Sequence, residues 1–117
     1  MRRVAALAVA AVLVAGCGST ASKQAEDIGS VASEGALLAH DAAEGSTTDN
    51  FTRVHGRALR DLAKKIADAP KTRQVGRVAG TVASELDVLA DHPGDQERAA
   101  QVERRLERAA KAAGKLE

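Results

Sequence analysis

The 117-residue chain has few of the residues that build reactive sites or stacking surfaces. It contains no Trp and no Tyr, and Phe51 is its single Phe. Such a chain offers no row of aromatic rings on which nucleic-acid bases could stack. A formal net charge of +1 also gives no general attraction to a phosphate backbone. We therefore expect no nucleic-acid partner.

Cysteine and catalytic signatures are equally scarce. Cys17 is the only cysteine, so the chain cannot form an internal disulfide. No serine stands in a Gly-x-Ser-x-Gly or Ser-x-x-Lys arrangement, the patterns that mark common serine nucleophiles. Carboxylate pairs occur only where helical periodicity predicts exposure to solvent, and nothing there separates their pKa values. We expect no enzymatic activity and no cofactor.

The N-terminus is the most informative part of the sequence. Arg2 and Arg3 precede residues 4–15, which are all Val, Ala or Leu. A basic start followed by an apolar segment of about 7–15 residues is typical of a secretory signal. As a helix this segment would span about 18 Å, which is short of the ~30 Å hydrocarbon core of a bilayer. It therefore predicts export rather than a permanent transmembrane helix.

Cys17 follows Val14, Ala15 and Gly16 directly at the end of the apolar segment. This aliphatic-small-small-cysteine order resembles the lipobox of bacterial lipoproteins, with Val14 where leucine is more usual. The resemblance covers residues 1–17. It implies transfer of diacylglycerol to the Cys17 thiol and cleavage before it, which would leave the mature chain on the extracytoplasmic face of the cell membrane. The other interpretation is an ordinary signal peptide followed by an unrelated cysteine.

The remainder is long enough for one small domain. We divide the chain into a signal peptide (1–16), a lipidated Cys17 with a polar tether (17–22) and a helical domain (23–117). Removal of Arg2 and Arg3 with the signal changes the formal charge from +1 to −1. The mature protein is therefore expected to be nearly neutral.

Four later segments carry apolar residues at helical spacing, and none shows the alternation of a strand. Gly45 suits a helix C-cap, Pro70 ends or begins a helix, and Pro93 suits an early helical position. The predicted helices are about 22–43, 50–69, 72–90, and 93 or 96 to 113. Because the loops are short, the sequence predicts an all-α fold, a small antiparallel up-down four-helix bundle.

Each predicted helix has an apolar face that we expect to be buried. In the first these residues are Ile28, Val31, Ala32, Gly35, Leu38, Ala39 and Ala42; in the second, Phe51, Val54, Ala58, Leu59, Leu62, Ile66 and Ala69. In the third they are Val75, Val78, Ala79, Val82, Leu86 and Leu89; in the fourth, Val102, Leu106, Ala109 and Ala113. Leu37 and Val88 fall on polar faces, and would mark a contact patch if they were neighbours.

Arg53, Arg57, Arg60 and Lys64 recur along the second predicted helix and form what we call the basic stripe. One interpretation is a solvated face opposite the core. The other is a surface for an anionic partner such as phospholipid head groups, wall polymers or an acidic protein. Asp27, Glu34 and Asp41, seven residues apart on the first predicted helix, form an acidic stripe that could meet the basic stripe of a neighbouring copy.

Metal binding has only weak candidates. His40 and Glu44 share a helix face at i,i+4, and His55 could join them. No Glu-x-x-His occurs, although di-iron carboxylate bundles need that spacing. We therefore expect no metal. The leading functional hypothesis is a membrane-anchored, non-catalytic lipoprotein that binds a partner or supports the envelope. The alternative is a ligand or metal carrier with a cavity around His40, His55 and Phe51.

Overall fold

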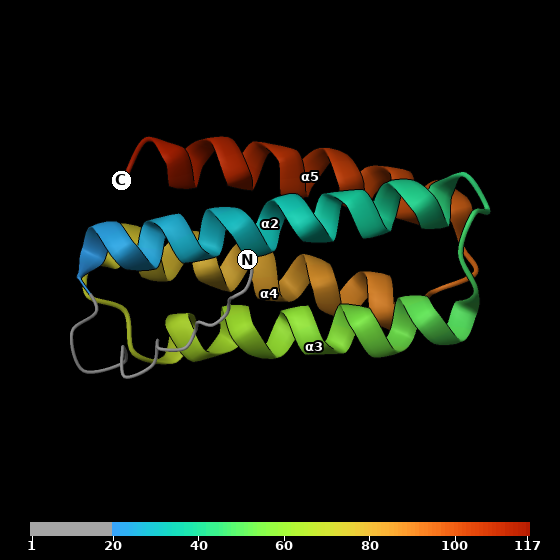
Figure 1. Ribbon diagram of the computed structural model, residues 1–117, viewed down its shortest axis with the longest axis horizontal. Helices are drawn as coiled ribbons and strands as arrows, with labels where there is room; N and C mark the ends of the chain where they lie inside the picture. Colours follow the sequence, from blue (N-terminus) through green and yellow to red (C-terminus); the bar gives the residue numbers. More distant parts are fainter. Residues whose placement is uncertain (1–19) are drawn as a thin grey trace, which may run out of the picture.

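The computed structural model describes residues 20–117, which form four helices joined by short loops. The predictions for residues 1–19, including the signal peptide and the lipobox, lie outside the described residues. The helices are α2 (Ala21–Ala43), α3 (Asp49–Asp68), α4 (Arg73–Asp91) and α5 (Gln96–Gly114). Successive helices run in opposite directions (Figure 1). The predicted all-α up-down four-helix bundle is confirmed.

Helix boundaries follow from local capping. Thr20, Thr48, Thr72 and Asp95 precede the four helices, and each side-chain oxygen accepts a hydrogen bond from the backbone N–H three residues later. α2 therefore begins at Ala21, inside the segment predicted as tether. α5 begins at Gln96, so Pro93 lies in the preceding turn.

The end of α2 is a Schellman motif. Gly45 has φ of 72°, the left-handed region that glycine adopts without strain. Its N–H donates to the carbonyl of Ala42, and the N–H of Ser46 donates to that of Asp41. The helix end predicted at Gly45 is present, but the C-cap itself is Glu44 and Gly45 is the residue that follows it.

The bundle is flattened rather than square, with dimensions of 39 × 32 × 20 Å. α2 packs chiefly on α5, and α3 packs chiefly on α4. The two pairs meet through α2 and α4, whereas α3 and α5 do not touch and lie at opposite edges (Figure 1). As an edge helix, α3 has one extensive neighbour and only a narrower contact with α2.

The core lies where α2, α4 and α5 meet, and its largest fully buried side chains include Ile28, Leu86 and Leu106. At its centre, a Cβ on Gly35 would lie 2.9 Å from Leu86 Cδ2 and 3.0 Å from Leu106 Cδ1. Gly35 thus permits α2 to approach both neighbours closely. The faces expected to be buried on α2 and α5 are buried throughout, and that of α4 is buried except for the half-buried Val78.

The buried face predicted for α3 is largely wrong. Leu59 is buried and Ile66 is half-buried, as expected. The buried face instead consists of Thr52, Gly56, Leu59 and Ala63. The residues that proved to be exposed are Phe51, Val54, Ala58, Leu62 and Ala69. The smaller side chains allow α3 to lie close to α4: a Cβ on Gly56 would be 3.4 Å from the Cβ of Ala90.

Candidate functional site

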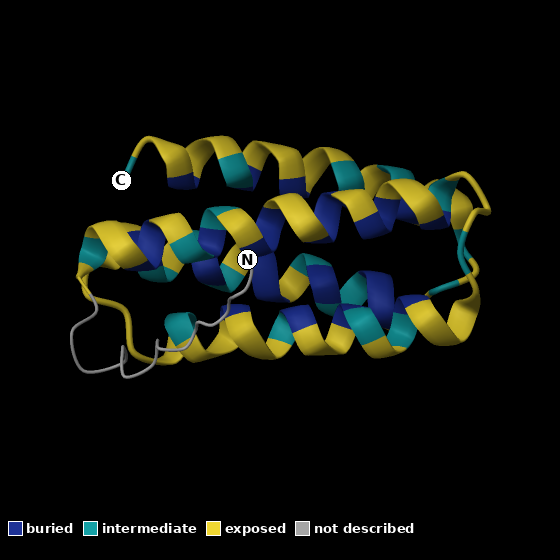
Figure 2. Ribbon diagram, viewed as in Figure 1, coloured by how far each residue is buried: buried dark blue, intermediate teal, exposed yellow. Residues whose placement is uncertain are grey.

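Phe51, Val54, Ala58 and Leu62 form an exposed apolar stripe, which we call the α3 face. The relative exposure of Phe51 is 54%, that of Val54 60% and that of Leu62 50%. At 100° per residue, Phe51, Ala58 and Leu62 fall within about 40° of one another around the helix. Figure 2 shows that much of the visible side of α3 is exposed. Single exposed aliphatic residues are ordinary, but a contiguous apolar stripe indicates a contact surface.

The α3 face adjoins α2. His55 stacks on Phe51, with ring centroids 5.3 Å apart and an angle of 18° between the ring planes. On its other side, His55 Nε2 lies 3.6 Å from Oε2 of Glu34 on α2. Glu34 belongs to the acidic stripe, so that stripe borders the α3 face along the α2 side.

The acidic stripe is partly neutralised within its own helix. Lys23 Nζ lies 2.9 Å from Asp27 Oδ1, and this hydrogen bond raises the pKa of Lys23. Glu34 has His55 as its neighbour. Asp41 is exposed, and no ion pair to it occurs among residues 20–117. The stripe therefore keeps net negative charge at the Asp41 end.

The basic stripe is divided by the fold. Arg60 Nη1 donates to Asp87 of α4 at 2.6 Å and Arg60 Nε donates to Asp61 at 3.0 Å, which raises the pKa of Arg60. Lys64 pairs with Asp68 at 3.3 Å. Arg53 is half-buried, and Arg57 is exposed. Arg60 thus serves the contact between α3 and α4, whereas Arg57 remains available to a partner.

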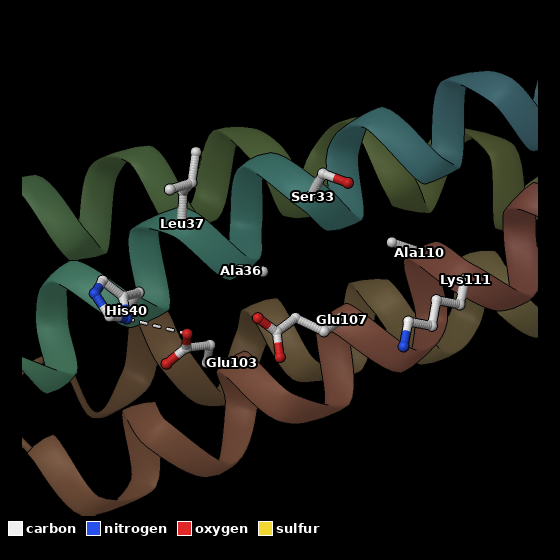
Figure 3. Close-up of a pocket in the computed structure, with 8 residues that line it drawn as sticks. All are labelled: Ser33, Ala36, Leu37, His40, Glu103, Glu107, Ala110 and Lys111. Atoms are coloured by element: carbon white, nitrogen blue, oxygen red, sulfur yellow. Dashed lines mark hydrogen bonds and ion pairs between the residues drawn. The ribbon is translucent and has the colours of Figure 1, made fainter.

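His40 points away from α3, toward α5. Its Nδ1 lies 3.0 Å from Glu103 Oε2 in an open cleft of about 680 Å³ between α2 and α5 (Figure 3). The cleft is lined by Ser33, Ala36, Leu37, His40, Glu103, Glu107, Ala110 and Lys111. It can offer one imidazole, two carboxylates and one ammonium group to a small polar molecule.

The weak metal candidates are not brought together as one site. His40 contacts α5, whereas His55 contacts Glu34 and Phe51. Glu44 is the C-cap of α2. No group of three His, Cys, Asp or Glu residues within residues 20–117 has a geometry suited to a metal ion. His40 lines the cleft between α2 and α5, whereas His55 stacks on Phe51 beside Glu34, so these three residues do not share one site.

Leu37 and Val88 do not form one patch. Leu37 is 66% exposed at the rim of the cleft between α2 and α5. Val88 is half-buried and packs against the core from α4.

Two features were missed by reasoning from the sequence: the exposure of the α3 face and the pairing of His40 with Glu103. A signal for the first was present. Thr52, Gly56, Leu59 and Ala63 repeat at i, i+4, i+7 and i+11, which describes a second continuous face made mostly of small residues. The pairing of His40 with Glu103 joins residues that are 63 positions apart, so no local sequence pattern indicates it.

Comparisons with protein families, with curated protein sequences and with solved structures found no match to this chain. None of the helices within residues 20–117 has a stretch long and apolar enough to cross a membrane.

Proposed function

We propose that the protein is a lipid-anchored, extracytoplasmic helical module whose role is to bind a protein partner through the α3 face. The observation that carries the binding role is the exposed stripe of Phe51, Val54, Ala58 and Leu62. Three large apolar side chains that are half or more exposed on one helix face represent apolar area that a partner would remove from water.

The charges beside the stripe support a protein partner. Arg57 is exposed and lies beyond the edge of the α3 face that is farther from α2. The acidic stripe of α2 borders the opposite edge of the α3 face. A contact surface with an apolar centre and charged flanks is the usual anatomy of a protein–protein interface. The flanking charges would select the partner and orient it, while the apolar residues would supply most of the affinity.

The anchor rests on Val14, Ala15, Gly16 and Cys17, whose order resembles a lipobox. Intact-mass analysis and membrane fractionation of the natively expressed protein test it directly. We expect a membrane-bound chain that begins at Cys17 and carries acyl mass, and a Cys17→Ala variant that lacks both. A soluble, unacylated wild-type protein would refute the anchor.

The binding role is tested separately by chemical cross-linking at the cell surface. Leu62→Asp places a charge in the α3 face at an exposed position, so it should abolish cross-linked products without unfolding the domain. Ser84→Asp, at an exposed position of α4, is the matched control and should leave those products unchanged. Equal products from both variants would remove the α3 face as the binding surface.

A small-ligand carrier is the second candidate, and the cleft between α2 and α5 favours it. The His40–Glu103 pair, Glu107 and Lys111 would bind a small polar molecule there. Its metal-dependent form is tested by metal analysis of protein purified without chelators and by thermal shift with Zn²⁺ and Cu²⁺. Absence of metal together with an unchanged Tm would exclude that form.

A further inference from the structure

We infer that a groove between α4 and α5 binds a small phosphate ester that carries a free hydroxyl group. The groove has a volume of about 410 Å³, a size typical of sites for small molecules. It shares no residue with the α3 face or with the cleft between α2 and α5. The inference therefore does not depend on the proposed binding of a protein partner. Its polar lining consists of Arg77, Thr81, Glu85, Arg105 and Arg108.

The groove has a surplus of positive charge. Arg77 lies on the α4 wall, Arg105 and Arg108 lie on the α5 wall, and Glu85 is the one carboxylate among its described lining residues. Arg105 Nη1 lies 3.6 Å from Glu85 Oε2. No ion pair to Arg77 or to Arg108 occurs among residues 20–117. These two guanidinium groups repel one another across the groove, and an anion between them would be attracted by both.

The packing of Gly35 fixes the level of α4 relative to α5. A Cβ on Gly35 would contact the ends of both Leu86 and Leu106, so these two leucines lie at nearly the same level. The two helices run in opposite directions (Figure 1). Residues before Leu86 on α4 therefore lie opposite residues after Leu106 on α5.

Thr81 lies between Arg77 and Arg108 along the groove. Measured from the level of the two leucines at 1.5 Å per residue, Arg108 is displaced by about 3 Å, Thr81 by about 7.5 Å and Arg77 by about 13.5 Å in the same direction. An arginine side chain is long enough to span the remaining distances, so both guanidinium groups can reach an anion beside Thr81. Arginine donates paired hydrogen bonds to phosphate, and the hydroxyl of Thr81 can donate another.

Glu85 is the part of the groove that would select a hydroxyl group. Its side chain is only 14% exposed. Glu85 Oε1 is buried without a hydrogen-bond partner, and Oε2 is too far from Arg105 for a hydrogen bond, so neither oxygen accepts one from residues 20–117. A carboxylate in this state is unfavourable, because it has lost water without gaining donors. A ligand hydroxyl that donates to Oε2 would supply the missing bond.

The distance between Thr81 and Glu85 fits the phosphate ester of a short polyol. The two residues are one helical turn apart, about 6 Å along the axis, which a three-carbon chain spans. Val78 and Ala109 also line the groove and offer the chain an apolar surface. Three guanidinium groups and one carboxylate leave two positive charges, which match a phosphate monoester dianion. Glycerol phosphate combines these features, and the same phosphoglycerol group occurs as a phospholipid head group.

Isothermal titration calorimetry of the full-length protein in a neutral detergent tests the inference. The probes are sn-glycerol 3-phosphate and propyl phosphate, which has the same charged group and the same number of carbon atoms but no hydroxyl. We expect the wild type to bind glycerol phosphate, and to bind propyl phosphate at least about tenfold more weakly. Glu85→Leu removes the acceptor, so this variant should lose the preference.

The role of the arginines is tested by a matched pair of double variants. Arg77→Ala with Arg108→Ala should weaken the binding of glycerol phosphate at least about tenfold. Arg73→Ala with Arg104→Ala is the control and should leave the affinity unchanged. Its two arginines lie on the same two helices and do not line the groove, and their loss changes the net charge equally. All four arginines are exposed, so both double variants should fold, as circular dichroism can verify.

A short-chain lipid, dihexanoylphosphatidylglycerol, distinguishes the two sources of the phosphoglycerol group. Dihexanoylphosphatidylcholine controls for uptake of lipid into the detergent. Binding of the former but not of the latter assigns the groove to a lipid head group, and binding of glycerol phosphate alone assigns it to a soluble ester.

Three results would overturn the inference. They are the absence of binding by both glycerol phosphate and the phosphatidylglycerol, equal binding by the groove variant and its control, and equal affinity of the wild type for glycerol phosphate and propyl phosphate. None of them bears on the α3 face, which cross-linking at the cell surface tests separately.

Discussion

Glu34 of α2 and His55 of α3 approach one another across the edge of the bundle, with 3.6 Å between Glu34 Oε2 and His55 Nε2. His55 in turn stacks on Phe51. This chain of contacts joins an acidic residue to an exposed aromatic residue on the neighbouring helix. It places the acidic stripe beside the α3 face, on which the proposed function depends.

Gly35→Ala should destabilise the domain. The new methyl group would meet the ends of Leu86 and Leu106, both fully buried. Overpacking of this kind costs about 1–3 kcal/mol, and the better helix propensity of alanine offsets about 1 kcal/mol of it. We expect a net loss of up to about 2 kcal/mol in the free energy of unfolding, measured by urea denaturation.

Gly80→Ala is the matched control for that substitution. Gly80 lies inside α4, and a Cβ there would meet no atom within 4 Å. We expect a gain of about 1 kcal/mol from helix propensity. If Gly35→Ala and Gly80→Ala are both more stable than the wild type, a methyl group fits between Gly35 and the side chains of Leu86 and Leu106. The prediction of overpacking at Gly35 would then be wrong.

Gln24→Ala should weaken the contact between α2 and the loop that joins α3 to α4. Gln24 Nε2 donates to the carbonyl of Ala69 at 3.0 Å, and the N–H of Lys71 donates to Gln24 Oε1 at 2.7 Å. Gln24 is itself buried, so its loss leaves two partly buried backbone groups without partners. The expected cost is about 1–3 kcal/mol. Gln101→Ala, at an exposed position of α5, should change the stability by less than about 0.5 kcal/mol.

The N-cap of α5 should make stability depend on pH in the acidic range. The backbone N–H of Arg98 donates to Asp95 Oδ1 at 3.0 Å, and this bond lowers the pKa of Asp95 in the folded protein. The contribution is therefore fully present above the ordinary aspartate pKa of about 3.9. It is lost as the pH falls through the lower pKa of the folded state.

Asp95→Asn separates the contribution of the carboxylate charge to stability from that of the N-cap hydrogen bond. Asparagine caps helices about as well as aspartate but does not titrate. The stability of wild type relative to Asp95→Asn should therefore decrease as the pH falls below about 4. Thermal unfolding between pH 7 and pH 2.5 measures this difference. A constant difference over that range would show that the carboxylate charge contributes nothing at this cap.

The two arginines of the basic stripe should behave differently. Arg60→Ala removes the hydrogen bond to Asp87 and with it a contact between α3 and α4, so the Tm should decrease. Arg57→Ala should leave the Tm unchanged, because no ion pair to Arg57 occurs within residues 20–117. A double-mutant cycle with Asp87→Ala isolates the Arg60–Asp87 coupling. If Arg57→Ala and Arg60→Ala change the Tm equally, the basic stripe is not divided into a residue that stabilises the α3–α4 contact and a residue that does not.

The sequence alone determined the four helices, their approximate ends, and the buried faces of α2, α4 and α5. These features are local. Helical periodicity, the capping oxygens of Thr20, Thr48 and Thr72, and the left-handed glycine at Gly45 act over a few residues and do not depend on which helices become neighbours. Short loops then left antiparallel packing as the expected arrangement.

Only the tertiary structure decided which face of α3 is buried. The helix carries two faces that could enter a core, one with Phe51 and Leu62 and one with Gly56 and Ala63. In a flattened bundle α3 has one extensive neighbour, and the face with smaller side chains lets it lie closest to α4, where Gly56 meets Ala90. The larger apolar side chains consequently remain at the surface. Apolar periodicity indicates that a face exists, but the fit between whole helices decides which face is covered.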